Sequence, residues 1–129
     1  MKNEFIPYEQ ALELKQIGFD EPCFGRYYYK DSYPMLNINS GETELVFEFG
    51  RYVKQSEVTI LGPLYQQAFR WFRQKYRLTG LVEIGTQEYS FLIFDENTDS
   101  REITSSMNGA YEEAELACLK KLIEIVKTK

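Results

Sequence analysis

The last stretch of the chain carries two neighbouring rows of apolar side chains, and this pattern constrains the fold more than any other feature. The rows have helical spacing and follow Asn108 and Gly109. They are Ala114, Cys118, Leu122 and Ile125, and Leu116, Leu119, Ile123 and Val126. Glutamates crowd the first turns of this stretch and lysines lie towards its end, which is the charge order that the helix dipole favours. A helix with so broad an apolar face predicts a flat partner, a β-sheet.

Two further helices are predicted from residue spacing and from proline and glycine positions. The first begins at Pro7, whose fixed φ suits the first helical turn, and ends at Gly18. With Gly18 in the left-handed conformation, Leu14 and Phe19 form the apolar pair of a Schellman motif. The second helix opens at residues 62–63 and runs to about residue 76, with a wide aromatic face.

Apolar runs between these helices predict strands. They lie at residues 26–30, 35–39, 44–49, 81–84 and 88–94, with a further short piece at 57–61. Strands and helices do not alternate one for one, so we predict an α+β fold in a single domain, residues 1–129. It comprises an antiparallel sheet of about five strands with three helices, in the order α-β-β-β-α-β-β-α. We expect the sheet and last helix to bury Leu45, Phe47, Phe91, Ile93, Leu119 and Leu122 together.

Composition excludes several classes of chemistry. The sequence contains no histidine, which removes Ser-His-Asp and Cys-His nucleophile pairs and histidine metal ligands. It also contains no glycine-rich phosphate- or dinucleotide-binding motif. We therefore expect no catalytic residues, no metal and no cofactor. With 15 basic and 20 acidic residues, the net charge of −5 disfavours a generic DNA duplex binder.

Cysteine content and hydropathy indicate the compartment. The two cysteines, Cys23 and Cys118, are expected to be thiols, because a secreted disulfide framework needs more cysteines at closer spacing. No apolar run is long enough for a signal peptide or a membrane span. We therefore expect a cytoplasmic protein that does not enter a membrane.

A polar stripe on the second helix is one candidate binding surface. Its residues follow helical spacing on the face opposite the aromatic side chains: Gln66, Arg70, Arg73 and Arg77. Guanidinium groups at this spacing can hold phosphates or carboxylates bidentately. The alternative is a solvated helix face whose arginines pair with surface carboxylates.

A tyrosine cluster is the other candidate binding surface. It consists of Tyr27, Tyr28, Tyr29 and Tyr33. Because a strand alternates its faces, three consecutive tyrosines cannot all enter one core. Exposed tyrosines are typical of protein interfaces, so this strand is a candidate for a partner or for a homo-oligomer contact. The alternative is a second sheet face covered by a helix or by another copy of the chain.

Paired carboxylates are a third candidate site, for acid–base chemistry. Glu44 and Glu48 share one strand face, and Glu83 and Glu88 lie near a hairpin. Paired carboxylates run acid–base chemistry when burial separates their pKa values, whereas alternating glutamates usually mark the wet face of a sheet.

The segment after the last predicted strand has the spacing that opens a calcium loop, from Asp95 through Asn97 to Asp99. Ser100 and Ser106 stand where that loop needs glycine and glutamate, so the sequence favours a strand-end turn. Residues 96–109 form the longest irregular stretch, a length typical of functional or mobile loops.

Four segments resemble small uncharacterised proteins from phages and prophages of Bacteroidetes-like bacteria. They are residues 6–11 (IPYEQA), 18–24 (GFDEPCF), 63–73 (PLYQQAFRWFR) and the helix that begins at 111–115 (YEEAE). These proteins have no established activity, so the resemblance implies no site residues. It implies a phage accessory protein that acts in the host cytoplasm.

Three functions follow as hypotheses. The first is a non-catalytic phage protein that binds and modulates a host protein, such as a defence or regulatory factor. The second is a nucleic-acid or nucleotide binder that uses Arg70, Arg73 and Arg77 with neighbouring tyrosines. The third is a small enzyme based on carboxylates.

Overall fold

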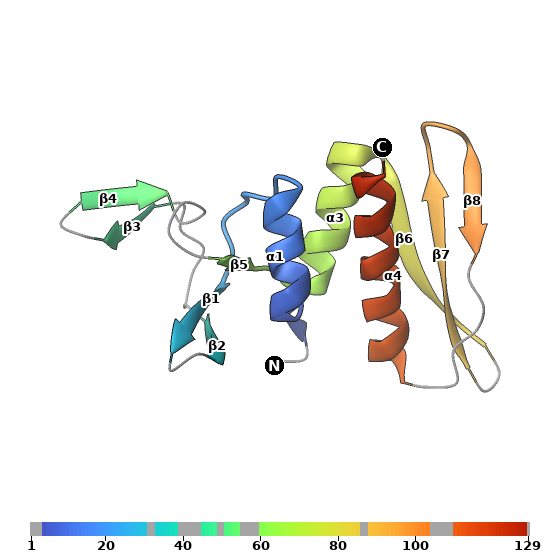
Figure 1. The fold of residues 1–129 in the computed structure, drawn as a ribbon. Helices are drawn as coiled ribbons and strands as arrows, with labels where there is room; N and C mark the ends of the chain where they lie inside the picture. The colour runs from blue at the N-terminus through green and yellow to red at the C-terminus, as the bar shows by residue number, and fades with distance from the viewer. Residues whose placement is uncertain are drawn as a thin grey trace. The chain divides into compact units, whose positions relative to one another are not determined.

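A computed structural model describes the backbone of residues 4–30, 33–38, 45–48, 51–54, 60–85, 88–103 and 110–128. Its elements are α1 (Tyr8–Gln16), β1 (Gly25–Lys30), β2 (Tyr33–Ile38), β3 (Leu45–Glu48), β4 (Arg51–Lys54), β5 (Ile60–Gly62), α3 (Tyr65–Tyr76), β6 (Leu78–Ile84), β7 (Tyr89–Asp95), β8 (Ser100–Ile103) and α4 (Tyr111–Lys127) (Figure 1). The described residues thus confirm the α+β class and the three predicted helices. The chain divides into two compact units, Met1–Leu64 and Tyr65–Lys129. A single domain over the whole chain stays a prediction.

The prediction that the strands form a single sheet of about five strands is wrong. In the described residues the strands form three separate antiparallel sheets, in the orders β2-β1-β5, β3-β4 and β6-β7-β8. Strands β4 and β8 were not predicted, and β8 occupies part of the expected loop at 96–109. Alternation of side chains marks a strand but does not specify its partner, and strands joined by short connections pair with each other first.

Helix α1 ends as the sequence predicts. Gly18 has a positive φ of 101°, and its N–H donates to the Lys15 carbonyl at 3.1 Å. The Phe19 N–H donates to the Leu14 carbonyl at 2.9 Å, and both side chains are buried. These two hydrogen bonds and this apolar pair are the Schellman motif, so Gly18 is required here for its conformation.

The first unit joins its sheet to the N-terminal segment through close backbone contacts. Strand β1 is the middle strand, between β2 and β5. A Cβ at Gly25 would lie 2.8 Å from the Gly62 carbonyl oxygen and equally close to the Phe5 ring. The Ile6 N–H donates to the Pro63 carbonyl at 3.0 Å. The absence of a side chain at Gly25 therefore lets β1, β5 and Phe5 approach one another.

The second unit has both its helices against a three-stranded meander. Helix α4 packs on β6 and β7, and α3 packs on β6 and on α4 (Figure 1). The buried residues of α4 are Ala114, Cys118, Leu119, Leu122 and Ile123, and two of them, Cys118 and Leu122, lie against Gly80 of β6. Phe91 and Ile93 of β7 are buried as well, which confirms the predicted core of this unit.

Leu45 and Phe47, also expected in that core, belong instead to β3, whose pairing partner is β4. Their side chains lie outside the described part of the structure.

Two elements begin at other residues than the sequence predicts. Helix α3 begins at Tyr65, because Gly62 still belongs to β5, and the strand predicted at 81–84 begins earlier, at Leu78, as β6.

Two sequence expectations about chemistry and membranes can be compared with this fold. Cys23 and Cys118 are buried thiols in the structure. Across the residues that the structure describes, no helix combines the length and the apolar character that a membrane crossing requires.

Candidate functional site

Helix α3 has a buried face and an exposed face, as its sequence pattern predicts. Ala68, Trp71 and Phe72 are buried, whereas Gln66 and Arg70 are exposed. Arg73 is exposed one turn further along. The buried side is held by ring contacts, including Trp71 edge to face on Phe72 with centroids 5.1 Å apart. The aromatic face of the helix is therefore buried, and the polar stripe on its opposite face is exposed.

An open depression lies along this stripe. Its volume is about 370 Å³, and its lining consists of Gln66, Phe69, Arg70, Arg73 and Gly80. The first four residues come from α3, and Gly80 comes from β6. Three of the residues predicted from helical spacing are thus brought together at one hollow. We call this hollow the α3 depression.

The α3 depression is positively charged. Within the described residues, neither Arg70 nor Arg73 forms an ion pair. Phe69 is half-buried and lines the same hollow, so it offers an apolar surface beside Arg70 and Arg73; its ring lies 6.2 Å from that of Tyr65. Gly80 contributes no side chain, so its backbone is open to the hollow. Such a site can receive a carboxylate or phosphate together with an apolar or planar group.

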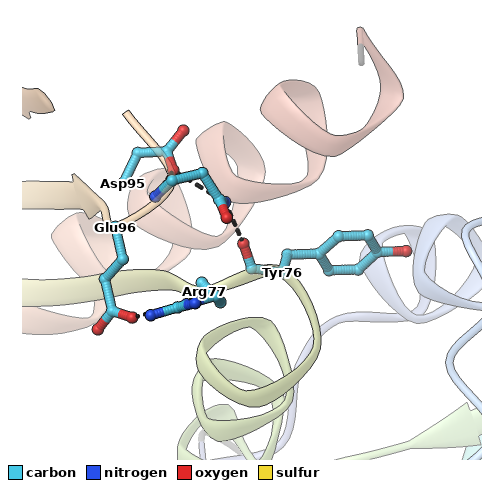
Figure 2. A network of polar contacts seen from close by, with 5 residues as sticks. Tyr76, Arg77, Asp95 and Glu96 are labelled. Carbon is cyan, nitrogen blue, oxygen red and sulfur yellow. Dashed lines mark hydrogen bonds and ion pairs between the residues drawn. The ribbon is translucent and has the colours of Figure 1, made fainter. Parts of the chain in front are cut away.

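Arg77 does not continue the stripe, contrary to the prediction. Helix α3 ends at Tyr76, and Arg77 has a positive φ of 58°, which takes it out of the helical register. Its Nε donates to Glu96 Oε2 at 3.1 Å (Figure 2), and its carbonyl accepts the Glu96 N–H at 3.0 Å. The left-handed conformation costs roughly 1–2 kcal/mol for a residue with a Cβ. The Glu96 contacts hold Arg77 in that conformation, away from the α3 depression.

The turn after β7 caps the C-terminal end of α3 with a side-chain hydrogen bond. Asn97 Nδ2 donates to the Tyr76 carbonyl at 2.9 Å and to Asp95 Oδ1 at 3.1 Å. The Asn97 backbone N–H donates to the same Asp95 oxygen at 2.9 Å. Figure 2 shows this network at the junction of the helix and the strand. The polar spacing that opens a calcium loop therefore belongs to a strand-end turn that caps a helix, as the sequence favours.

The tyrosine cluster is only partly described. The Tyr27 hydroxyl donates to the Ile6 carbonyl at 2.6 Å, and its ring meets Tyr8 edge to face at 5.5 Å. Burial raises the pKa of Tyr27 above its usual value. Tyr27 is therefore engaged inside its own unit. The side chains of Tyr28, Tyr29 and Tyr33 lie outside the described part of the structure, and their partner-binding role stays a prediction.

The carboxylates of the enzyme hypothesis are not brought together at a described site. Glu83 is exposed and Glu88 is half-buried at the β6–β7 hairpin. Glu44 and the side chain of Glu48 lie outside the described residues. Over the ranges that the structure covers, no group of three or more Cys, Asp or Glu side chains could hold a metal ion.

Two residues of the α3 depression were missed as site residues. Phe69 belongs to the aromatic arc by spacing, but it lies at the border of that arc and remains half-buried. Gly80 falls between the predicted helix, which ends at about residue 76, and the predicted strand at 81–84, whereas it lies within β6. Helical spacing locates the arginines, but only the packing of α3 beside β6 locates the glycine.

Comparison of this chain with protein families, curated proteins and solved structures finds no match. The resemblance to phage proteins therefore stays a prediction.

Proposed function

We propose that this chain is a non-catalytic binding protein and that the α3 depression receives an acidic side chain of a protein partner. The observation that carries the proposal is the pair of exposed guanidinium groups, Arg70 and Arg73, beside the half-buried ring of Phe69. Arginine binds a carboxylate through two parallel hydrogen bonds, and the phenyl ring can contact the aliphatic stem of the same side chain. Neither arginine is neutralised by a described carboxylate.

The resemblance to phage proteins supplies the kind of partner. It supports a host protein, such as a defence or regulatory factor, met in the host cytoplasm. This part of the proposal rests on the resemblance, whereas the acidic character of the contact rests on Arg70 and Arg73.

A nucleotide or a nucleic acid is the second candidate, because an aromatic ring beside arginines can stack on a base while the guanidinium groups hold phosphate. Two observations favour the acidic protein partner over this second candidate. The chain has a net charge of −5, and the Arg77 guanidinium is paired with Glu96. Only two cations then line the depression, whereas duplex binders commonly make about 6–10 phosphate contacts.

The test is a titration with a glutamate-rich peptide, comparing wild type with Arg70→Gln/Arg73→Gln. Each exposed ion pair contributes up to about 1 kcal/mol, so the double variant should bind about tenfold more weakly. Arg77→Gln is the matched control, because it removes the same charge next to the same helix but outside the depression. We expect its affinity to match that of wild type. Equal losses in both variants would show general charge attraction and contradict the proposal.

A second titration separates the two candidate ligands. Labelled single- and double-stranded oligonucleotides and a nucleoside triphosphate are added at low salt. We expect weaker binding than for the peptide. Micromolar binding that Arg70→Gln/Arg73→Gln abolishes, with a salt slope that falls by about 0.7–0.9 per arginine, would favour the nucleic-acid function instead.

A further inference from the structure

A second surface of the Tyr65–Lys129 unit lies where the β6–β7 hairpin meets the start of α4. Ile84 and Tyr89 are partners in the strand register, so their side chains leave the same face of the sheet. The rings of Tyr89 and Tyr111 meet edge to face, with centroids 5.8 Å apart and planes at 88°. These three residues therefore form one contiguous group from three elements, β6, β7 and α4. We call it the hairpin patch.

The hairpin patch is an uncovered continuation of the core face. Residues two apart in a strand share a face, so Tyr89 lies on the same side of β7 as Phe91. Phe91 is only 5% exposed, whereas Ile84 is 77% and Tyr111 is 42% exposed. Helix α4 begins at Tyr111 and so leaves Ile84 uncovered. Single exposed apolar residues are common, but a contiguous group marks a contact surface.

The charges beside the hairpin patch are negative. Glu112, Glu113 and Glu115 lie in the first turns of α4, where the helix dipole favours them. Burial first, and then nearby groups that include the Glu115 and Glu112 carboxylates, raise the pKa of Tyr111. Within the described residues, no lysine or arginine forms an ion pair with any of the three glutamates.

We infer that the hairpin patch binds a protein segment with an apolar anchor flanked by lysine or arginine. The anchor covers Ile84 and Tyr111, and the basic residues face the glutamates of α4. Charge complementarity of this kind speeds association and selects the partner, while the apolar contact supplies most of the affinity. The surface is distinct from the α3 depression, which is positive and would take an acidic group, so the inference does not rest on the proposed function.

The test uses two amphipathic helical peptides as probes, one of leucine and lysine and one of leucine and glutamate, added to the full chain. Backbone amide shifts in NMR spectra report the contact. We expect the leucine–lysine peptide to shift Ile84, Tyr89 and Tyr111. Ile84→Ser should weaken its binding about tenfold, the loss expected when one side chain no longer buries apolar surface.

Matched variants make the outcomes decisive. Leu81→Ser alters another exposed apolar residue of β6, 42% exposed against 77% for Ile84, on the opposite sheet face and should leave the affinity unchanged. Glu112→Gln/Glu115→Gln should lower the affinity and its salt dependence, whereas Arg70→Gln/Arg73→Gln should not. Equal binding of the leucine–glutamate peptide, or shifts centred on Leu81, would overturn the inference. Shifts of the patch with protein concentration alone would overturn it too, in favour of a second copy of the chain.

Discussion

The two flanks of strand β6 meet at Gly80 and differ in packing. On the α4 side, a Cβ at Gly80 would lie 2.8 Å from the Cys118 Sγ atom and 3.1 Å from the Leu122 Cδ1 atom. On the α3 side, Gly80 lines an open depression of about 370 Å³ together with Arg70 and Arg73. One flank has no room for a methyl group, and the other has room for a ligand group.

This difference separates residues that determine stability from residues that are free to bind. Interiors packed to crystal density respond to the gain or loss of one methyl group. Exposed side chains away from such packing usually change stability by less than about 0.5 kcal/mol when they are replaced. Substitutions on the α4 flank should therefore change folding, and substitutions on the α3 flank should change binding.

The largest effect is expected at the centre of the packed flank. Leu122 is fully buried against the sheet, so Leu122→Ala removes apolar contacts and leaves a cavity. We expect a loss of about 2–5 kcal/mol in the free energy of unfolding, measured by denaturant titration. A loss below about 1 kcal/mol would show that α4 packs differently on β6 and β7.

Adding a methyl group at Gly80 tests the same packing from the opposite direction. Gly80→Ala should cost about 1–3 kcal/mol, because Cys118 and Leu122 must move. Cys118→Ala removes the nearest atom, so Gly80→Ala should cost less in that background, with a coupling of at least about 0.5 kcal/mol. Equal costs in both backgrounds would mean that the sulfur does not limit the approach of α4 to β6.

The same thiol gives a pH dependence. Burial, and to a lesser extent Glu115, raises the pKa of Cys118 to about 12. The unfolded thiol ionises near pH 8.5, so above that pH the unfolded state loses a proton that the folded state keeps. Stability should therefore fall by about 1–2 kcal/mol between pH 8 and pH 10. Cys118→Ala should lack this part of the decline. Identical pH profiles for both proteins would contradict burial of the thiol.

A smaller effect is expected at the end of α3. Asn97→Ala removes the side-chain donor to the Tyr76 carbonyl and should cost about 0.5–1.5 kcal/mol. Glu96→Gln alters only an ion pair whose side chains are 66% and 39% exposed, so it should cost less than about 0.5 kcal/mol. The reverse order of the two losses would show that the ion pair, rather than the amide, fixes the junction of α3 and β7.

Local signals in the sequence predict local structure well here. The Gly18 helix end follows from one glycine and one apolar pair, and the buried α4 face follows from helical spacing alone. The partners of the strands do not follow, because the pattern of β3 is compatible with any antiparallel neighbour, and the structure pairs it with β4. Strand β8 was missed because its residues, SREI, carry little alternation.

The candidate site was predictable to the same extent. Gln66, Arg70 and Arg73 share one helix face, so spacing brings them together. Arg77 has the correct spacing as well, but a helix that ends at Tyr76 cannot hold it in that row. The contact that stops the helix comes from Glu96 and Asn97, which are distant in sequence. Tertiary capping of this kind has no signal in the helix itself.

The division between a packed flank and a binding flank is tested most directly by the unfolding free energy of Arg70→Gln/Arg73→Gln, measured on the same samples as its peptide affinity. We expect stability within about 0.5 kcal/mol of wild type together with an affinity about tenfold weaker. A stability loss above about 1 kcal/mol with unchanged peptide affinity would contradict this division, because the two arginines would then stabilise the fold rather than bind a partner.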